Sequence, residues 1–177
     1  ASAKNRGLRT TTMHVIAALA LVLAGCGSAV AADMPRASFY GVGLVHIGMT
    51  TDELAKALGH PVGPQDSDEA SCFYVAAADN SFSVMVSDGR AVRIDVDTPS
   101  IATLRGARVG DRASVVRGLY GRALEEQPHF YSGLPDLYLT YFSRDRRYAL
   151  RFETREGVVS RYYLGYAEPA QYVEGCS

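Results

Sequence analysis

Two segments of the chain carry the same pattern at a constant offset of 62 residues, and this repeat constrains the fold more than any other feature. Residues 45–59 read as an aliphatic residue and a glycine, a short cap, one amphipathic helix and a closing glycine. Residues 107–121 repeat that order. The spacing therefore predicts one short helix in each copy.

The ends of both predicted helices carry capping residues. In the first copy, Thr50 and Glu53 have the spacing of a capping box, in which each side chain bonds a backbone N–H at the helix start. In the second copy, Asp111 is expected to cap the helix. Gly59 and Gly121 stand where a left-handed residue ends a helix.

After each helix the apolar period changes from 3.6 to 2, which indicates strands. The expected strands are 72–78, 82–87 and 91–96 in the first copy, and 137–142, 148–153 and 158–164 in the second. The second copy is about six residues longer, most simply within 128–135. We predict an α+β protein of two tandem units, 39–98 and 99–177, each with a helix or helical hairpin on an antiparallel sheet of three to four strands. Neither unit is large enough to form a sufficient core alone.

The N-terminal region has the three-part pattern of a secretory signal. Lys4, Arg6 and Arg9 precede ten apolar residues at 15–24, and small residues follow. As a helix, ten residues cover roughly 15 Å, about half of a bilayer's hydrocarbon core. The run is therefore predicted to be a cleaved leader and not an anchor.

The tetrapeptide Leu-Ala-Gly-Cys that ends at Cys26 resembles the lipobox of bacterial lipoproteins. The resemblance implies acylation of Cys26, a signal peptide at 1–25 and a flexible tether at 26–38. Ordinary cleavage after Ala31 or Ala32 is the alternative, since small residues alternate there as well.

The expected location is the cell envelope. Enteric-type lipoproteins are sorted to the outer membrane, facing the periplasm, when the residue after the acylated cysteine is not Asp. Gly27 stands at that position. From Cys26 onward the chain has 15 basic and 19 acidic residues, a net charge of −4. Because no basic excess remains, we expect no nucleic-acid partner.

Cys72 and Cys176 are the remaining cysteines after Cys26. In an oxidising compartment two such cysteines of a small domain usually form a disulfide, and two free thiols are the alternative.

The first helix start resembles two known protein families. Ile47-Gly48-Met49-Thr50, followed by Glu53-Leu54 and Leu58-Gly59, is similar to the Gly-Met-Thr helix start of the β-lactamase inhibitor protein and of the small lipoprotein subunit of the outer-membrane β-barrel assembly machinery. The inhibitor is a tandem of two helix-plus-sheet units, and the assembly subunit is a lipoprotein with one unit. The resemblance implies this fold and a protein partner. Asp111-Arg112 replaces Met49-Thr50 in the second copy, which weakens the transfer of a partner.

No motif predicts catalysis, a cofactor or a metal. The histidines lack metal-ligand spacing, no serine lies in a Gly-x-Ser-x-Gly motif, and neither Cys72 nor Cys176 has a nucleophile context. The histidines considered are His46, His60 and His129. Residues 66–69, and Asp95 with Asp97, could offer carboxylates to calcium, but they lack the spacing of a calcium loop. Solvated charges are favoured there.

A binding surface is the remaining candidate for function. Alternation along two strands is expected to expose Arg151, Arg161, Tyr163 and Tyr138 on one face of the second sheet. The 128–135 segment adds Phe130 and Tyr131. Tyrosine and arginine are enriched at interfaces, although such tyrosines can also be half-buried sheet residues. We expect a non-catalytic module that binds an envelope or secreted protein, with a periplasmic small-ligand or glycan binder as the alternative.

Overall fold

The computed structural model describes Ala1 and residues 35–65 and 71–176, and the described residues from 35 onward belong to one compact unit. The predicted leader (1–25), Cys26, most of the 26–38 tether and the acidic residues 66–69 lie outside the described residues. No helix in the described part has the length and apolar character needed to span a bilayer.

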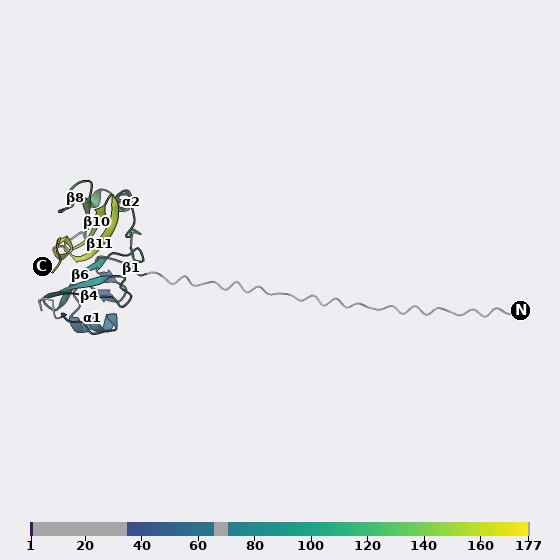
Figure 1. Cartoon of the computed structure of the whole chain (residues 1–177), viewed down its shortest axis with the longest axis horizontal. Helices are drawn as coiled ribbons and strands as arrows, with labels where there is room; N and C mark the ends of the chain where they lie inside the picture. Colours follow the sequence, from purple (N-terminus) through teal and green to yellow (C-terminus); the bar gives the residue numbers. More distant parts are fainter. Residues whose placement is uncertain (2–34, 66–70, 177) are drawn as a thin grey trace. The chain divides into compact units, whose positions relative to one another are not determined.

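The main element is an antiparallel sheet of seven strands (Figure 1). Across the sheet the order is β4 (Cys72–Ala76), β5 (Ser83–Ser87), β6 (Arg90–Val96), β11 (Val158–Tyr166), β10 (Tyr148–Arg155), β9 (Leu137–Phe142) and β8 (Leu124–Pro128). Short strands form a second sheet in the order β3 (Val45–His46), β2 (Gly41–Val42), β1 (Arg36–Ala37) and β7 (Ala102–Thr103), in which β1 and β7 are parallel. The fold class is therefore α+β.

The strands expected in two separate sheets belong to one sheet, because β6 pairs with β11. All six expected strands are present within a few residues of their predicted ends. Two tight hairpin turns help to set these ends. Asp88 and Gly89, like Glu156 and Gly157, have positive φ angles, which suit two-residue turns between antiparallel strands.

The first helix, α1 (Thr51–Leu58), has the predicted ends. The Thr50 side chain accepts a hydrogen bond from the Glu53 backbone N–H, the Glu53 carboxylate accepts one from the Thr50 backbone N–H, and Gly59 is left-handed.

The cap predicted for the second helix, α2 (Ala113–Tyr120), is wrong. Arg112 is the N-cap residue and makes no side-chain capping bond. Asp111 lies one position too early, and its carboxylate instead accepts a hydrogen bond from the Arg108 backbone N–H. Gly121 follows α2 with a positive φ but outside the left-handed helical region.

One face of the large sheet packs into the hydrophobic core. Leu150 and Phe152 of β10 are buried there with Leu54 of α1 and Val116 of α2. Figure 1 places α1 near β4 and α2 near β8 and β10. The alternate strand residues lie on the opposite face, which also buries polar side chains. That second face carries the candidate site.

Candidate functional site

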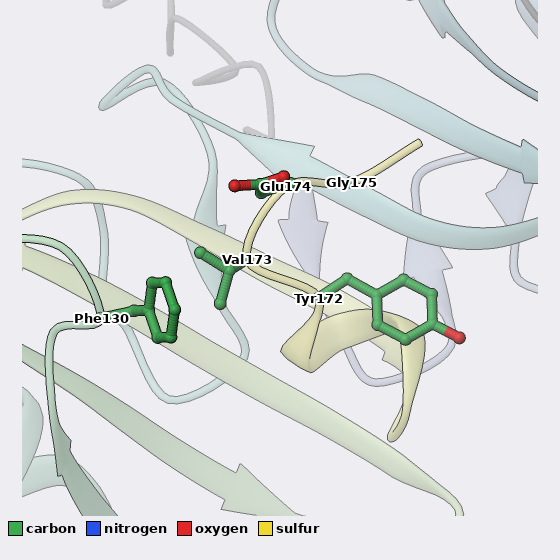
Figure 2. A pocket seen from close by; sticks show the side chains of 5 residues that line it. All are labelled: Phe130, Tyr172, Val173, Glu174 and Gly175. Atoms are coloured by element: carbon green, nitrogen blue, oxygen red, sulfur yellow. The ribbon is translucent and has the colours of Figure 1, made fainter. Parts of the chain in front are cut away.

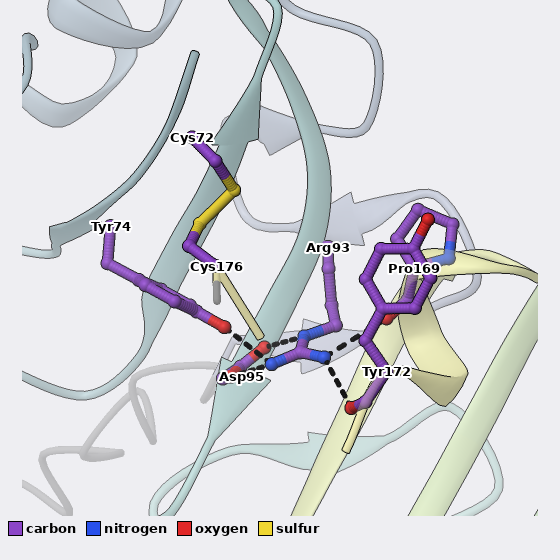
Figure 3. Close-up of a disulfide and its surroundings, with 7 residues drawn as sticks. All are labelled: Cys72, Tyr74, Arg93, Asp95, Pro169, Tyr172 and Cys176. Carbon is purple, nitrogen blue, oxygen red and sulfur yellow. Dashed lines mark hydrogen bonds and ion pairs between the residues drawn. A yellow bond between two sulfur atoms is a disulfide. The ribbon is translucent and has the colours of Figure 1, made fainter. Parts of the chain in front are cut away.

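The second face of the sheet is covered at its centre by the C-terminal residues 167–176, here called the C-terminal strap. The strap includes the short helix η2 (Pro169–Gln171) and ends at the predicted disulfide, which is confirmed. The sulfur atoms of Cys72 and Cys176 are 2.11 Å apart, and the bond joins the strap to β4 (Figure 3).

Arg93 of β6 holds the strap from beneath. This residue is 3% exposed. Its Nη1 donates to the backbone carbonyls of Pro169 and Tyr172 at 3.0 Å each, and Nε and Nη2 donate to Asp95 at 2.7 and 2.9 Å (Figure 3). Nη2 also donates to the Tyr74 hydroxyl at 2.5 Å. A buried guanidinium with this many partners fixes the strap in one position.

Residues 129–136 form a second covering segment, here called the 129–136 loop. His129 accepts hydrogen bonds at Nδ1 from the backbone N–H groups of Tyr131 and Ser132, at 3.3 and 3.2 Å. Because Nδ1 accepts, the ring hydrogen is on Nε2, which points to the Glu153 carboxylate at 3.2 Å. The His129 ring also stacks on Tyr138, with centroids 4.7 Å apart. The loop and the strap meet where the Tyr131 hydroxyl donates to Glu174.

Between these segments and the sheet lies an open polar cleft of about 360 Å³. Its lining residues are His129, Tyr131, Ser132, Asp136, Tyr138, Glu153, Thr154, Arg155, Arg161, Tyr163 and Val173. Glu153 is central, since it accepts from His129 and, at 2.5 Å, from the Tyr163 hydroxyl. Both donors to the Glu153 carboxylate are side chains of the protein itself. These hydrogen bonds position the 129–136 loop, and the cleft offers no obvious nucleophile.

The predicted exposure of Arg151, Tyr163 and Tyr138 is wrong. All three side chains are buried, whereas Arg161 is exposed. Alternation places these residues on the correct face, but the loop and the strap cover that face. The Arg151 guanidinium lies 3.9 Å from the centre of the Tyr138 ring. These residues support the cleft from below.

Burial changes the pKa values of side chains on this face. Burial, followed by the hydrogen bond to Glu153, raises the pKa of the Tyr163 phenol, and burial lowers the pKa of the Arg151 guanidinium. Burial opposes the charge of Arg161, but nearby Tyr163 and Glu153 raise the pKa of Arg161 above its ordinary value. The phenols of this face therefore stay neutral hydrogen-bond donors at physiological pH.

Phe130 and Tyr131 are exposed, as predicted, and three further side chains join them. Five large apolar or aromatic side chains, here called the apolar rim, stand on the loop and the strap: Phe130 (71% exposed), Tyr131 (63%), Leu134 (71%), Tyr172 (40%) and Val173 (38%). Phe130, Tyr172 and Val173 line a common pocket with Glu174 and Gly175 (Figure 2). The sequence analysis does not place Tyr172 and Val173 beside Phe130, because interactions between distant residues, namely the disulfide, the Arg93 hydrogen bonds and the Tyr131–Glu174 hydrogen bond, bring the chain end to this loop.

No cluster of three metal-ligating side chains occurs within residues 35–65 and 71–176. Of the carboxylates considered for calcium, Asp95 has both oxygens bonded to Arg93, and Asp97 lies beyond the end of β6.

Comparison with known proteins gives a structural relative. No family model matches the chain, and no curated protein sequence matches it. The chain is similar to the crystal structure of a DUF4309 family protein, YjgB, from Bacillus subtilis subsp. subtilis str. 168, with 16% identity over 66% of this chain and 78% of that chain. The TM-score is 0.45, too low to carry an argument about function. The resemblance of the first helix start to two known protein families stays a hypothesis.

Proposed function

We propose that the protein is a non-catalytic cell-envelope lipoprotein that binds another protein through the apolar rim. The observation that carries this proposal is that five exposed apolar side chains lie on two segments held from below, and that three of them, Phe130, Tyr172 and Val173, line one pocket. Exposed aromatic groups in fixed positions bind with little loss of conformational entropy. An assembly accessory or an inhibitor of a secreted enzyme would fit such a surface.

We further propose that α1 with β4 to β6, and α2 with β9 to β11, are two copies of one unit. Both runs contain a helix and three consecutive antiparallel strands, although β8 stands between α2 and β9 in the second run, and both helices are followed by a glycine. This tandem reading is compatible with an inhibitor-like fold, in which neighbouring units present one surface.

The membrane attachment is tested separately from the binding surface. In the proposed lipoprotein, acylated Cys26 is the N-terminal residue. We expect mass spectrometry of membrane-extracted protein to detect this acylated N-terminus. An unmodified N-terminus at Ala32 or Asp33 would show ordinary cleavage and rule out the lipid anchor.

Site-specific photo-crosslinking tests the surface. A benzophenone amino acid at Phe130 is expected to give a discrete adduct in envelope extracts. The same group at Leu44, an apolar residue that is 75% exposed outside the apolar rim, is the matched control and is expected to give none. Equal labelling from both positions, or no adduct from Phe130, would contradict binding through the apolar rim.

A glycan or another small ligand in the polar cleft is the second candidate. The cleft joins aromatic side chains to hydroxyl and guanidinium groups, a combination suited to sugars. Thermal-shift screening against peptidoglycan fragments separates the two functions, because only this second one requires a stabilising small ligand.

A further inference from the structure

We propose that the pocket between Phe130 and the C-terminal strap receives a lysine or arginine side chain of the protein partner. Its aliphatic stem lies on Phe130 and Val173, and its cationic group pairs with Glu174. This inference rests on the proposed function and adds to it the chemistry of the partner at one position.

The pocket has one apolar wall and one charge. It has a volume of about 500 Å³ and is lined by Phe130, Tyr172, Val173, Glu174 and Gly175. In Figure 2 the Val173 side chain lies beside the Phe130 ring, and Glu174 lies above Val173, next along the strap. Lysine and arginine have the matching shape, an aliphatic stem that ends in a cation.

Glu174 has no cationic partner among residues 35–65 and 71–176. Its carboxylate accepts a hydrogen bond from the neutral Tyr131 hydroxyl. The ion pairs of the described residues are Arg93–Asp95, Arg117–Glu126 and Arg146–Glu125, and the His129–Glu153 contact is the Nε2 hydrogen bond described above. Glu174 is exposed to solvent, so its carboxylate is accessible to a cation of a partner.

Within the described residues, no cationic side chain lies over the rings of Phe130 and Tyr172, the aromatic residues of the pocket. Within the described part of the chain, arginines lie over seven rings, those of Tyr74, Tyr120, Tyr138, Tyr141, Phe142, Tyr148 and Tyr163. None of these rings belongs to the apolar rim. Phe130 packs against the ring of Tyr131, with centroids 5.0 Å apart, and the residue is 71% exposed without a cation from the described residues, so a partner's cation could stack there.

The strap positions Glu174 before any partner arrives. Gly175 has a φ of +68°, and a Cβ atom there would lie 2.4 Å from the Tyr74 hydroxyl oxygen, so the backbone packs closely on Tyr74. Cys176 then fixes the end of the strap to β4. A purely apolar side chain in this pocket would take water from Glu174 without replacing it, whereas a cation would replace it with an ion pair. The net charge of −4 beyond the leader also favours encounter with a cationic surface.

Isotope-edited NMR of the full protein with two short peptides tests the inference. The first peptide is acetyl-Gly-Arg-Gly-amide, and the second replaces Arg with neutral citrulline of nearly the same shape. We expect saturable shifts of the amides of Phe130 and residues 172–175 with the arginine peptide, and about fivefold weaker binding of the citrulline peptide.

Two variants make the assignment to Glu174 specific. Glu174→Gln keeps an acceptor for the Tyr131 hydroxyl, so it is expected to fold normally and to lose the preference for arginine. Glu126→Gln removes another exposed carboxylate, one that already pairs with Arg117, and it is expected to leave binding unchanged.

Three results would overturn the inference. They are equal affinity for both peptides, shifts confined to another surface, and line broadening at the pocket that disappears on dilution of the protein alone, which would identify a second copy as the occupant. Photo-crosslinking from Phe130 can succeed whichever peptide result is obtained, so failure of the charge preference is distinguishable from failure of the proposed function.

Discussion

At the scale of single residues, Arg93 is the side chain on which the candidate site most depends. It is buried, and it joins Asp95 of its own strand to two carbonyls of the strap. We expect Arg93→Met to lower the free energy of unfolding by about 3 kcal/mol, because the Asp95 side chain, which is 18% exposed, then loses its cation. Urea denaturation measures this loss.

Arg117 provides the matched control for Arg93. It pairs with Glu126 at 2.8 Å, but both side chains are more than a third exposed. We expect Arg117→Met to cost less than about 1 kcal/mol. Similar losses in the two variants would contradict a special role for the buried guanidinium.

The Tyr74 phenol predicts how stability depends on alkaline pH. Burial, followed by the nearby charge of Asp95, raises the pKa of Tyr74 from 10.0 to about 12. A raised pKa in the folded state gives stability that is complete below pH 10 and is lost as the pH rises through about 12. Denaturation at pH 9, 10 and 11 should show this decline, and Tyr74→Phe should make it shallower. An unchanged slope in that variant would assign the decline to other groups, such as Tyr162 and Tyr163, whose pKa values burial also raises.

At the scale of secondary-structure elements, the two helices differ in their first turns. The side chain of Thr50 caps α1, whereas Arg112 provides no side-chain cap for α2. We expect Thr50→Ala to destabilise the protein by about 1 kcal/mol and Arg112→Ser to stabilise it by a few tenths to about 1 kcal/mol. Thermal denaturation of both variants measures the two effects. A loss of stability in Arg112→Ser would mean that the Arg112 side chain has a role beyond the helix start.

The sequence predicts local elements well because their signals are local. The Thr50 and Glu53 spacing identifies α1, and the Asp88-Gly89 pair identifies the β5 to β6 turn. The cap of α2 is off by one residue, since Asp111 is a good capping residue in the wrong position. Strand β8 has no apolar alternation at all, because Glu125, Glu126 and Gln127 are exposed at the edge of the sheet.

At the scale of the whole molecule, the site is harder to predict because it combines distant segments. Alternation correctly separates Arg151 from Phe152, but it cannot say what covers each face. The cover over Arg151 and Tyr163 comes from residues 129–136 and from the chain end, and neither segment has a periodic pattern. The signal that could have located the strap is Cys176. Its bond to Cys72 brings residues 172–175 onto the sheet, which makes Tyr172 and Val173 neighbours of Phe130.

The disulfide therefore connects global stability to the assembly of the binding surface. It links residues 104 positions apart, for which the chain-entropy treatment gives about 4 to 5 kcal/mol, and measured values are often smaller. We expect the double variant Cys72→Ser with Cys176→Ser to lose a few kcal/mol of unfolding free energy. The amides of residues 172–175 should also exchange hydrogen faster than those of β10, since the strap can then open without the sheet.

Cys26→Ser removes the remaining cysteine and is expected to leave strap exchange unchanged. If strap exchange in the double variant follows that of β10, the non-covalent contacts of the strap, which include the Arg93 hydrogen bonds, are sufficient to hold it. In that case the apolar rim would remain assembled under reducing conditions, and photo-crosslinking from Phe130 would not depend on the disulfide.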